Sequence, residues 1–174
     1  MEELKGFIRN IPDFPKKGIQ FKDVTTLFQD RYGFQMCLDA FESILRYMPI
    51  DKVAGIESRG FVLGAALADR LKCGMVLVRK KGKLPGETIR QSYELEYGTD
   101  ELEVHLGAVK PGERVLLVDD LLATGGTLEA AAKLIEKLGG KVESMACIIE
   151  LTGLNGRKKL GKTPFISLIS YDED

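Results

Sequence analysis

The segment VLLVDDLLATGGT, residues 115–127, contains a pattern of residues that could bind a phosphorylated sugar. Four apolar residues, which predict a buried strand, run directly into two aspartates, and a short loop with two glycines follows. Glycines allow backbone N–H groups to converge on an anion, and a helix that begins near residue 127 would add its positive end. The residues with this expected role are Asp119, Asp120, Ala123, Thr124, Gly125, Gly126 and Thr127.

The two carboxylates of this segment narrow the chemistry further. Beside a bound phosphate they would be repulsive unless they faced a neutral group rich in donors, or a cation. A ribose diol and a magnesium ion both meet that condition. The alternative is an ordinary turn, because Asp and Gly are common turn formers and TGGT alone is a weak signal. The whole string of apolar strand, two acids, small loop and helix start is much more specific.

The elements around this segment alternate between helix and strand. Near-continuous apolar strands separated by helices predict an α/β fold with a parallel sheet of about five strands, flanked by helices on both faces. Ligands bind such sheets at the carboxyl ends of the strands, where Asp119 and Asp120 are expected. The expected strands are 53–56, 75–79, 114–118, 142–151 and 165–170, and the expected helices are 35–48, 60–71 and 127–140.

Two segments depart from this alternation. Residues 79–105 begin basic and rich in glycine, and then alternate between apolar and polar residues, which predicts a mobile loop leading into an antiparallel hairpin. Near the N-terminus, Pro12, Pro15 and Gly18 exclude a long helix and predict an irregular cap, or hood, over about residues 1–34. We expect residues 1–174 to form one domain.

Composition excludes several classes of function. Lys and Arg total 25 and Asp and Glu total 26, so no general charge favours binding to nucleic acid or to an anionic membrane. The sequence shows neither a signal peptide nor an apolar run of membrane-spanning length, and we expect a cytoplasmic protein.

Cys37, Cys73 and Cys147 are predicted to be buried and unpaired. His105, the sole histidine, is expected to be structural.

A second phosphate-binding pattern occurs in GRKKLGKT, residues 156–163, which fits a Walker phosphate loop. Such a loop must follow a buried strand directly and open a helix. Here Pro164 and the strand-like FISLIS follow instead, and the loop interior is basic. We therefore interpret the match as a lysine-rich surface turn.

VLLVDDLLATGGT resembles the phosphoribosyl-pyrophosphate signature of the type I phosphoribosyltransferase family. The segments DFPKKGIQFKDVT, AGIESRGFVLG, RKKGKLPGET, YELEYG and ELTGLNGRKKL resemble its adenine-using branch, in the same order. The resemblance implies the type I phosphoribosyltransferase fold and the conversion of adenine and phosphoribosyl pyrophosphate to AMP and pyrophosphate. It also implies a homodimer, and Mg²⁺ held mainly by substrate pyrophosphate and water rather than by direct protein ligands.

The resemblance assigns further roles by position. Glu96 matches the acid that contacts the imidazole edge of adenine, and Tyr97 matches a loop residue that closes the site. The positions that match pyrophosphate-binding residues are Ser58, Arg59, Arg79, Lys80 and Lys83, and those that match adenine-binding residues are Gln20, Phe21, Lys22 and Leu151. Many relatives have arginine where this chain has Lys22, and the two side chains are not equivalent.

Two other functions stay open at this point. A phosphoribosyltransferase for a 6-oxopurine such as xanthine or guanine generally places a lysine in the strand-end segment that faces the base, and ACIIELTG contains none. A regulator that senses the ligand without catalysis would need an output domain, for which 174 residues leave no room.

Overall fold

The computed structural model describes residues 2–94 and 98–172, which form a seven-stranded sheet and a separate two-stranded one. The strand order of the larger sheet is β5-β6-β4-β3-β7-β8-β9, and its last five strands are parallel, which confirms the expected core. These five strands are β4 (Gly74–Lys80), β3 (Lys52–Ile56), β7 (Arg114–Leu122), β8 (Lys141–Leu151) and β9 (Phe165–Tyr171).

Strand β7 is longer than the sequence predicts. The expected end was Val118, but the strand continues to Leu122, because pairing with β8 extends to Leu122 opposite Glu150. Pairing with the other neighbour, β3, ends at Val118. The two aspartates therefore lie on a part of β7 that projects past β3, at the edge where parallel sheets bind ligands.

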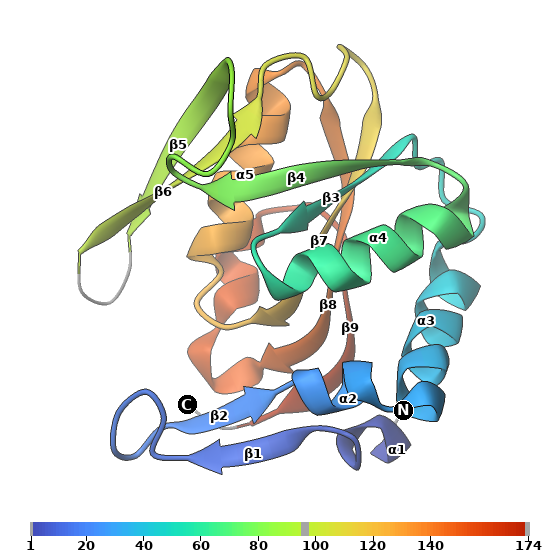
Figure 1. Cartoon of the computed structure of the whole chain (residues 1–174), viewed down its shortest axis with the longest axis vertical. Helices are drawn as coiled ribbons and strands as arrows, with labels where there is room; N and C mark the ends of the chain where they lie inside the picture. Colours follow the sequence, from blue (N-terminus) through green and yellow to red (C-terminus); the bar gives the residue numbers. More distant parts are fainter. Residues whose placement is uncertain (1, 95–97, 173–174) are drawn as a thin grey trace.

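Three helices cover the sheet, with α3 and α4 on one face and α5 on the other (Figure 1). They are α3 (Arg31–Leu45), α4 (Arg59–Leu71) and α5 (Gly126–Lys137). Successive residues of β7 serve both faces: Leu116 packs with α3 and α4, and Leu117 packs with α5. The sequence prediction placed α3 at 35–48. The helix begins earlier because the Asp30 side chain accepts hydrogen bonds from the first backbone N–H groups.

The N-terminal cap is more regular than expected. It contains α1 (Glu2–Lys5), β1 (Arg9–Pro12), β2 (Gln20–Asp23) and α2 (Thr25–Gln29). The two strands pair antiparallel, so the prediction of an irregular cap was wrong. In Figure 1 the cap lies along one end of the molecule, near both termini.

An antiparallel hairpin extends the sheet beyond β4, as the alternating pattern predicted. Its strands are β5 (Thr88–Glu94) and β6 (Thr99–His105). The connection contains Glu96 and Tyr97, which lie outside the described residues. At its base the fully buried Glu103 accepts hydrogen bonds from the backbone of Lys83 and from Arg90.

Two smaller expectations concern the cysteines and the membrane. Cys37 and Cys147 are buried and unpaired as predicted, whereas Cys73 is partly exposed, which corrects the prediction for that residue. In the part of the chain that the structure describes, no helix is long and apolar enough to cross a membrane.

Candidate active site

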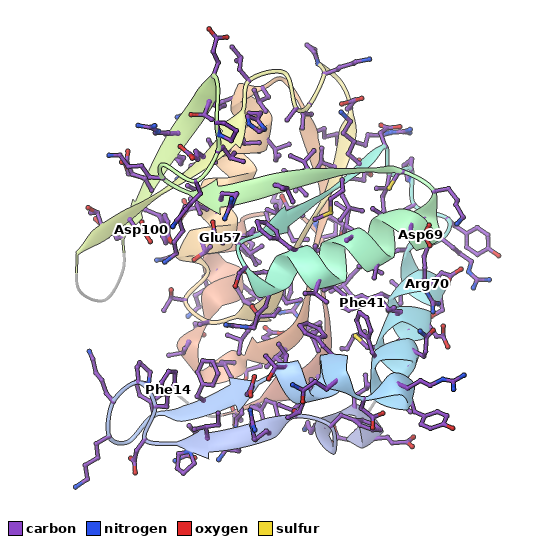
Figure 2. The ribbon with its side chains drawn as sticks, viewed as in Figure 1. Phe14, Phe41, Glu57, Asp69, Arg70 and Asp100 are labelled. Atoms are coloured by element: carbon purple, nitrogen blue, oxygen red, sulfur yellow. The ribbon has the colours of Figure 1, made fainter. Side chains whose placement is uncertain are left out.

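A cavity of about 440 Å³ opens where β3 and β7 end. Figure 2 shows Glu57 at the end of β3 and Asp100 on the hairpin, both on this side of the molecule. The peptide bond between Glu57 and Ser58 is cis. The residues that line the cavity are Glu57, Ser58, Arg59, Lys80, Tyr93, Asp119, Asp120, Leu121 and Thr127.

The centre of the cavity is an ion pair between α4 and β7. Nε of Arg59, the first residue of α4, donates to Oδ2 of Asp120 at 2.5 Å. Close approach of the two elements depends on Gly60, because a Cβ there would lie 2.9 Å from the Val118 carbonyl oxygen. The Asp120 side chain is only 7% exposed, and the Arg59 side chain is 41% exposed. The guanidinium is therefore fixed at one side yet open to a ligand.

Asp119 is the more unusual of the two acids. Burial, and then the nearby charge of Asp120, raise the pKa of Asp119 well above its ordinary value. Its Oδ1 accepts the Asp120 backbone N–H at 2.9 Å. A carboxylate in this position gains from a donor-rich ligand or a cation, either of which would favour its charged form.

The loop after β7 presents backbone donors at the start of α5. Gly125 has a positive φ of 83°, and its carbonyl accepts the first helical hydrogen bond, from the Glu129 N–H at 3.0 Å. The N–H groups of the intervening residues 126–128 therefore have no partner within the helix. A second cavity of about 70 Å³ adjoins the first here and is lined in part by Ala123, Thr124 and Thr127. This geometry suits an anion such as a monophosphate.

The expected pyrophosphate-binding residues divide into two groups. Lys80 lines the cavity, with Nζ 3.2 Å from Oδ2 of Asp100. Arg79 does not line it, since its Nε and Nη2 donate to Glu57 at 3.2 and 3.3 Å, and its Nη1 donates to the Lys83 carbonyl. Hydrogen bonds from Arg79 and the Lys80 backbone outweigh the burial that would raise the pKa of Glu57, and hold it below its ordinary value. The structure thus brings Ser58, Arg59 and Lys80 to the cavity and leaves Arg79 and Lys83 beside it.

Sequence reasoning missed three residues that line the cavity, Glu57, Tyr93 and Leu121, of which Glu57 and Tyr93 have polar side chains. The Tyr93 hydroxyl donates to Asp100 at 3.3 Å, and burial raises the pKa of Tyr93 to about 12, so the hydroxyl stays protonated. Tyr93 lies on the apolar face of the alternating hairpin, and that position was the available signal. Glu57 directly precedes the expected Ser58 and Arg59, and a strand-end acid beside them was the corresponding signal.

Phe21 brings the cap into contact with Arg59 of the cavity, although Phe21 itself does not line the cavity. The Phe21 ring centre lies 5.6 Å from Cζ of Arg59, within the range of a cation–π contact. Phe14 packs edge-on against the same ring, with centres 5.2 Å apart. An aromatic face is therefore held next to the ion pair of Arg59 and Asp120.

The other expected base-binding residues lie in the cap and at the end of β8. The Gln20 side chain accepts a hydrogen bond from Asn10. Lys22 donates to the same Asn10 at 3.2 Å and lies over the Tyr171 ring at 4.4 Å, so its ammonium is engaged by both the cap and β9. Leu151, the last residue of β8, pairs with Tyr171.

The donor set fits a magnesium ion that is held mainly by substrate oxygens and water. In residues 2–94 and 98–172, no three Asp, Glu, His or Cys side chains are grouped to hold a metal. Of the three cavity carboxylates, Glu57 is paired with Arg79 and Asp120 with Arg59. Mg²⁺ usually takes one or two carboxylates together with substrate phosphates and several waters. Asp119 and Asp120 could serve as such ligands, directly or through water.

The Walker-like segment does not form a phosphate loop. Strand β8 is followed by two short 3₁₀ helices, η1 (Thr152–Leu154) and η2 (Gly156–Leu160), and then by a turn into β9, so no α-helix opens after it. The segment was expected to be a surface turn, but Gly156 and Leu160 are buried.

His105, expected to be structural, contacts the Pro85 carbonyl oxygen at 2.8 Å through Nε2.

Known proteins resemble this chain over nearly its whole length. Residues 24–168 match the family described as the phosphoribosyl transferase domain. The adenine phosphoribosyltransferase of Geotalea daltonii is 53% identical over 171 residues, which cover 98% of this chain and 100% of the relative.

Solved structures of adenine phosphoribosyltransferases share the fold. The crystal structure of adenine phosphoribosyltransferase from Thermoanaerobacter pseudethanolicus has a TM-score of 0.95 and 55% identity, and covers 98% of this chain and 99% of its own. The Saccharomyces cerevisiae enzyme, complexed with adenine and an imino-altritol bisphosphate, has a TM-score of 0.91 and 41% identity, with 97% of both chains covered. The chain therefore belongs to the phosphoribosyltransferase family and, within it, to the adenine phosphoribosyltransferases.

Proposed function

We propose that this protein is a purine salvage enzyme that transfers the 5-phosphoribosyl group of phosphoribosyl pyrophosphate to adenine. A ring nitrogen of adenine bonds to the anomeric carbon of the ribose, and the bond from that carbon to pyrophosphate breaks. The partner ring nitrogen of adenine loses a proton to a base of the protein, and the products are AMP and pyrophosphate. Relatives that are 53% and 55% identical carry the name of this activity, and the yeast relative was solved with adenine bound.

The observation that carries the proposal is the arrangement of charge along the cavity. The N–H groups at the start of α5, which have no partner within the helix, suit the 5-phosphate, and the two acids of β7 suit the ribose hydroxyls. Arg59 and Lys80 line the same cavity and suit the pyrophosphate. The three parts of phosphoribosyl pyrophosphate thus each meet groups of complementary charge.

The same arrangement favours bond breaking. Positive charge develops on the ribose as the glycosidic bond breaks, as in other oxocarbenium-like transition states, and the carboxylates of Asp119 and Asp120 lie near that sugar. Negative charge develops on the departing pyrophosphate, which Arg59 and Lys80 can stabilise. A bound Mg²⁺ would be held mainly by pyrophosphate oxygens and water, with Asp119 and Asp120 able to contribute, and would neutralise part of the pyrophosphate charge.

Base binding and proton transfer are assigned by the resemblance. Phe21 and Leu151 would stack on adenine, and backbone groups near Gln20 and Lys22 would read its edge. Glu96 would take the proton from the ring nitrogen, and Tyr97 would help to exclude water when the loop closes. The position of the Phe21 ring beside Arg59 supports the placement of the base next to the ribose site.

We also propose that the protein acts as a homodimer. The resemblance implies this state, and exposed apolar side chains such as Tyr47, Val62 and Leu77 are available for contact with a second copy. Light scattering at several protein concentrations would measure the mass, and a monomer throughout would contradict the proposal.

A panel of nucleobases tests the activity. The protein is incubated with phosphoribosyl pyrophosphate, Mg²⁺ and either adenine, guanine, hypoxanthine or xanthine, and the monophosphate formed is identified. We expect AMP from adenine and little product from the 6-oxopurines. Preferential formation of GMP, IMP or XMP would instead identify a 6-oxopurine enzyme. Binding of phosphoribosyl pyrophosphate without any product would identify a ligand sensor.

A further inference from the structure

The buried glycine that begins η2 lies directly against the loop expected to bind the 5-phosphate. A Cβ on Gly156 would lie 2.2 Å from the Ala123 carbonyl oxygen, and a Cβ on Gly125 would lie 2.4 Å from the Gly156 carbonyl oxygen. Both contacts are with backbone atoms, which cannot rotate away as a side chain can. The phosphate loop and η2 are therefore packed backbone against backbone, at a distance that only glycine permits.

The next residue fixes η2 in place. Nε and Nη2 of Arg157 donate to the two carboxylate oxygens of Glu150 at 2.5 and 2.6 Å. Nη2 also donates to Ser167 at 3.2 Å, and the guanidinium lies 4.7 Å from the centre of the Phe165 ring. The Glu150 side chain is only 8% exposed, so it depends on this partner. Arg157 thus ties η2 to both β8 and β9.

Glu150, the partner of Arg157, lies next to the phosphate loop. Glu150 pairs across the sheet with Leu122, the last residue of β7. Ala123, whose carbonyl touches Gly156, follows Leu122 directly. The phosphate loop is therefore attached to the same rigid group twice, through the strand pairing and through Gly156.

We propose that Gly156 and Arg157 are positioning residues for the 5-phosphate, because they hold the loop of residues 123–126 in the shape that receives it. This inference rests on the proposed function, since it assigns the 5-phosphate to that loop. It also explains the Walker-like pattern, whose first glycine is needed for packing against a phosphate loop formed elsewhere in the chain. Neither residue lines the cavity, so both act through the loop.

The test is a comparison of Arg157→Lys and Gly156→Ala with the wild type. Affinity for phosphoribosyl pyrophosphate with Mg²⁺ is measured by calorimetry, and KM for each substrate and kcat are measured by AMP formation. Arg157→Lys keeps the positive charge but loses the bidentate hydrogen bond to Glu150. We expect affinity for phosphoribosyl pyrophosphate to fall about tenfold. Gly156→Ala should lower it by about tenfold to a hundredfold. KM for adenine and kcat at saturating substrate should change about twofold or less in both variants, since the base and the reacting atoms keep their contacts.

Lys158→Ala is the matched control, because Lys158 is an exposed neighbour in the same 3₁₀ helix, and its affinities should equal those of the wild type. Thermal melting checks that each variant is folded. If Gly156→Ala does not fold, the affinity of Arg157→Lys alone decides whether these residues position the phosphate loop.

Unchanged affinity for phosphoribosyl pyrophosphate, or an equal rise in the KM values for both substrates, would overturn the inference. A wild type that binds phosphoribosyl pyrophosphate but forms no AMP removes the proposed function alone, and the calorimetric comparison still decides the role of these residues. A wild type that does not bind it overturns both.

Discussion

The corner between β7 and α5 and the hairpin of β5 and β6 meet at the same cavity but are built in opposite ways. Residues 115–118 of β7 are fully buried and lie between two parallel neighbours, β3 and β8. In the hairpin, β5 forms the sheet edge and alternates between partly buried and exposed residues. Toward its base, β6 buries Leu102 and Val104 in the core, whereas toward its tip the hairpin is held by partly exposed ion pairs such as Lys80 with Asp100.

This difference separates two tasks. A site that must hold a fixed, highly charged substrate gains from the most rigid part of the core, where the backbone donors cannot shift. A segment that must admit substrate and then exclude water gains from an edge, where local opening breaks few apolar contacts. We therefore assign sugar-phosphate binding to the corner and the chemical step to the hairpin. The four changes below test that assignment, from the largest expected effect to the smallest.

Glu96→Gln in the hairpin connection should abolish most of the turnover. Loss of a general base typically costs about 10²–10⁴ in rate. Affinity for phosphoribosyl pyrophosphate should stay close to that of the wild type, because the corner is intact. Steady-state kinetics and calorimetry measure the two quantities. Glu101→Gln, on β6, is the control. An equal loss of activity in Glu101→Gln, or no loss in Glu96→Gln, would show that Glu96 has no role in the chemical step.

Leu117→Ala should destabilise the protein far more than Ile89→Ala. Leu117 is fully buried in β7, and such truncations cost about 2–5 kcal/mol of unfolding free energy. Ile89 is partly buried on the edge strand, and its truncation should cost roughly 1 kcal/mol because the site can collapse. Urea unfolding of the wild type and both variants measures the loss of unfolding free energy in each. Equal losses would contradict the contrast between core and edge.

Asp120→Asn should weaken binding of phosphoribosyl pyrophosphate and leave kcat less affected. The change removes the charge that faces the ribose and orients Arg59, and hydrogen bonds to charged groups contribute about 1.5–3 kcal/mol, or roughly tenfold to a hundredfold in affinity. Calorimetry checks this, with the exposed Asp69→Asn on α4 as control. Unchanged affinity would reject the ribose assignment.

Asp119→Asn should change how stability depends on pH. Burial and Asp120 raise the pKa of Asp119, so without ligand the folded protein keeps a proton that the unfolded chain releases. Wild-type stability should therefore fall as pH rises from about 4, the unfolded pKa, toward the folded pKa. The variant lacks this fall, so its stability should rise relative to the wild type as pH increases across the window. Urea unfolding at a series of pH values tests this, and parallel curves would contradict it.

Regular features of the fold could be predicted from the sequence because they depend on short-range patterns. The five apolar strands and the helix that begins within TGGT follow from periodicity and glycine signals. The end of β7 could not be predicted, because pairing with β8 rather than local composition carries that strand to Leu122. The two-stranded cap was missed for the same reason, since β1 and β2 are stabilised by pairing with each other.

The candidate site divides along similar lines. The consecutive residues of the corner were predictable because one segment contains them all. The ion pair between Arg79 and Glu57 could not be predicted, because it joins two strands that are distant in sequence. Gly156 was interpreted as part of a surface turn, and its contact with Ala123 depends on the tertiary fold alone.

A crystal structure of the protein with AMP tests the central assignment most directly. We expect phosphate oxygens within about 3.2 Å of the backbone nitrogens of Gly126 and Thr127. The ribose hydroxyls should face Asp119 and Asp120, and the base should lie beside Phe21. A phosphate bound instead between Arg59 and Lys80, with the loop of residues 123–126 empty, would contradict the assignment of the corner to the 5-phosphate.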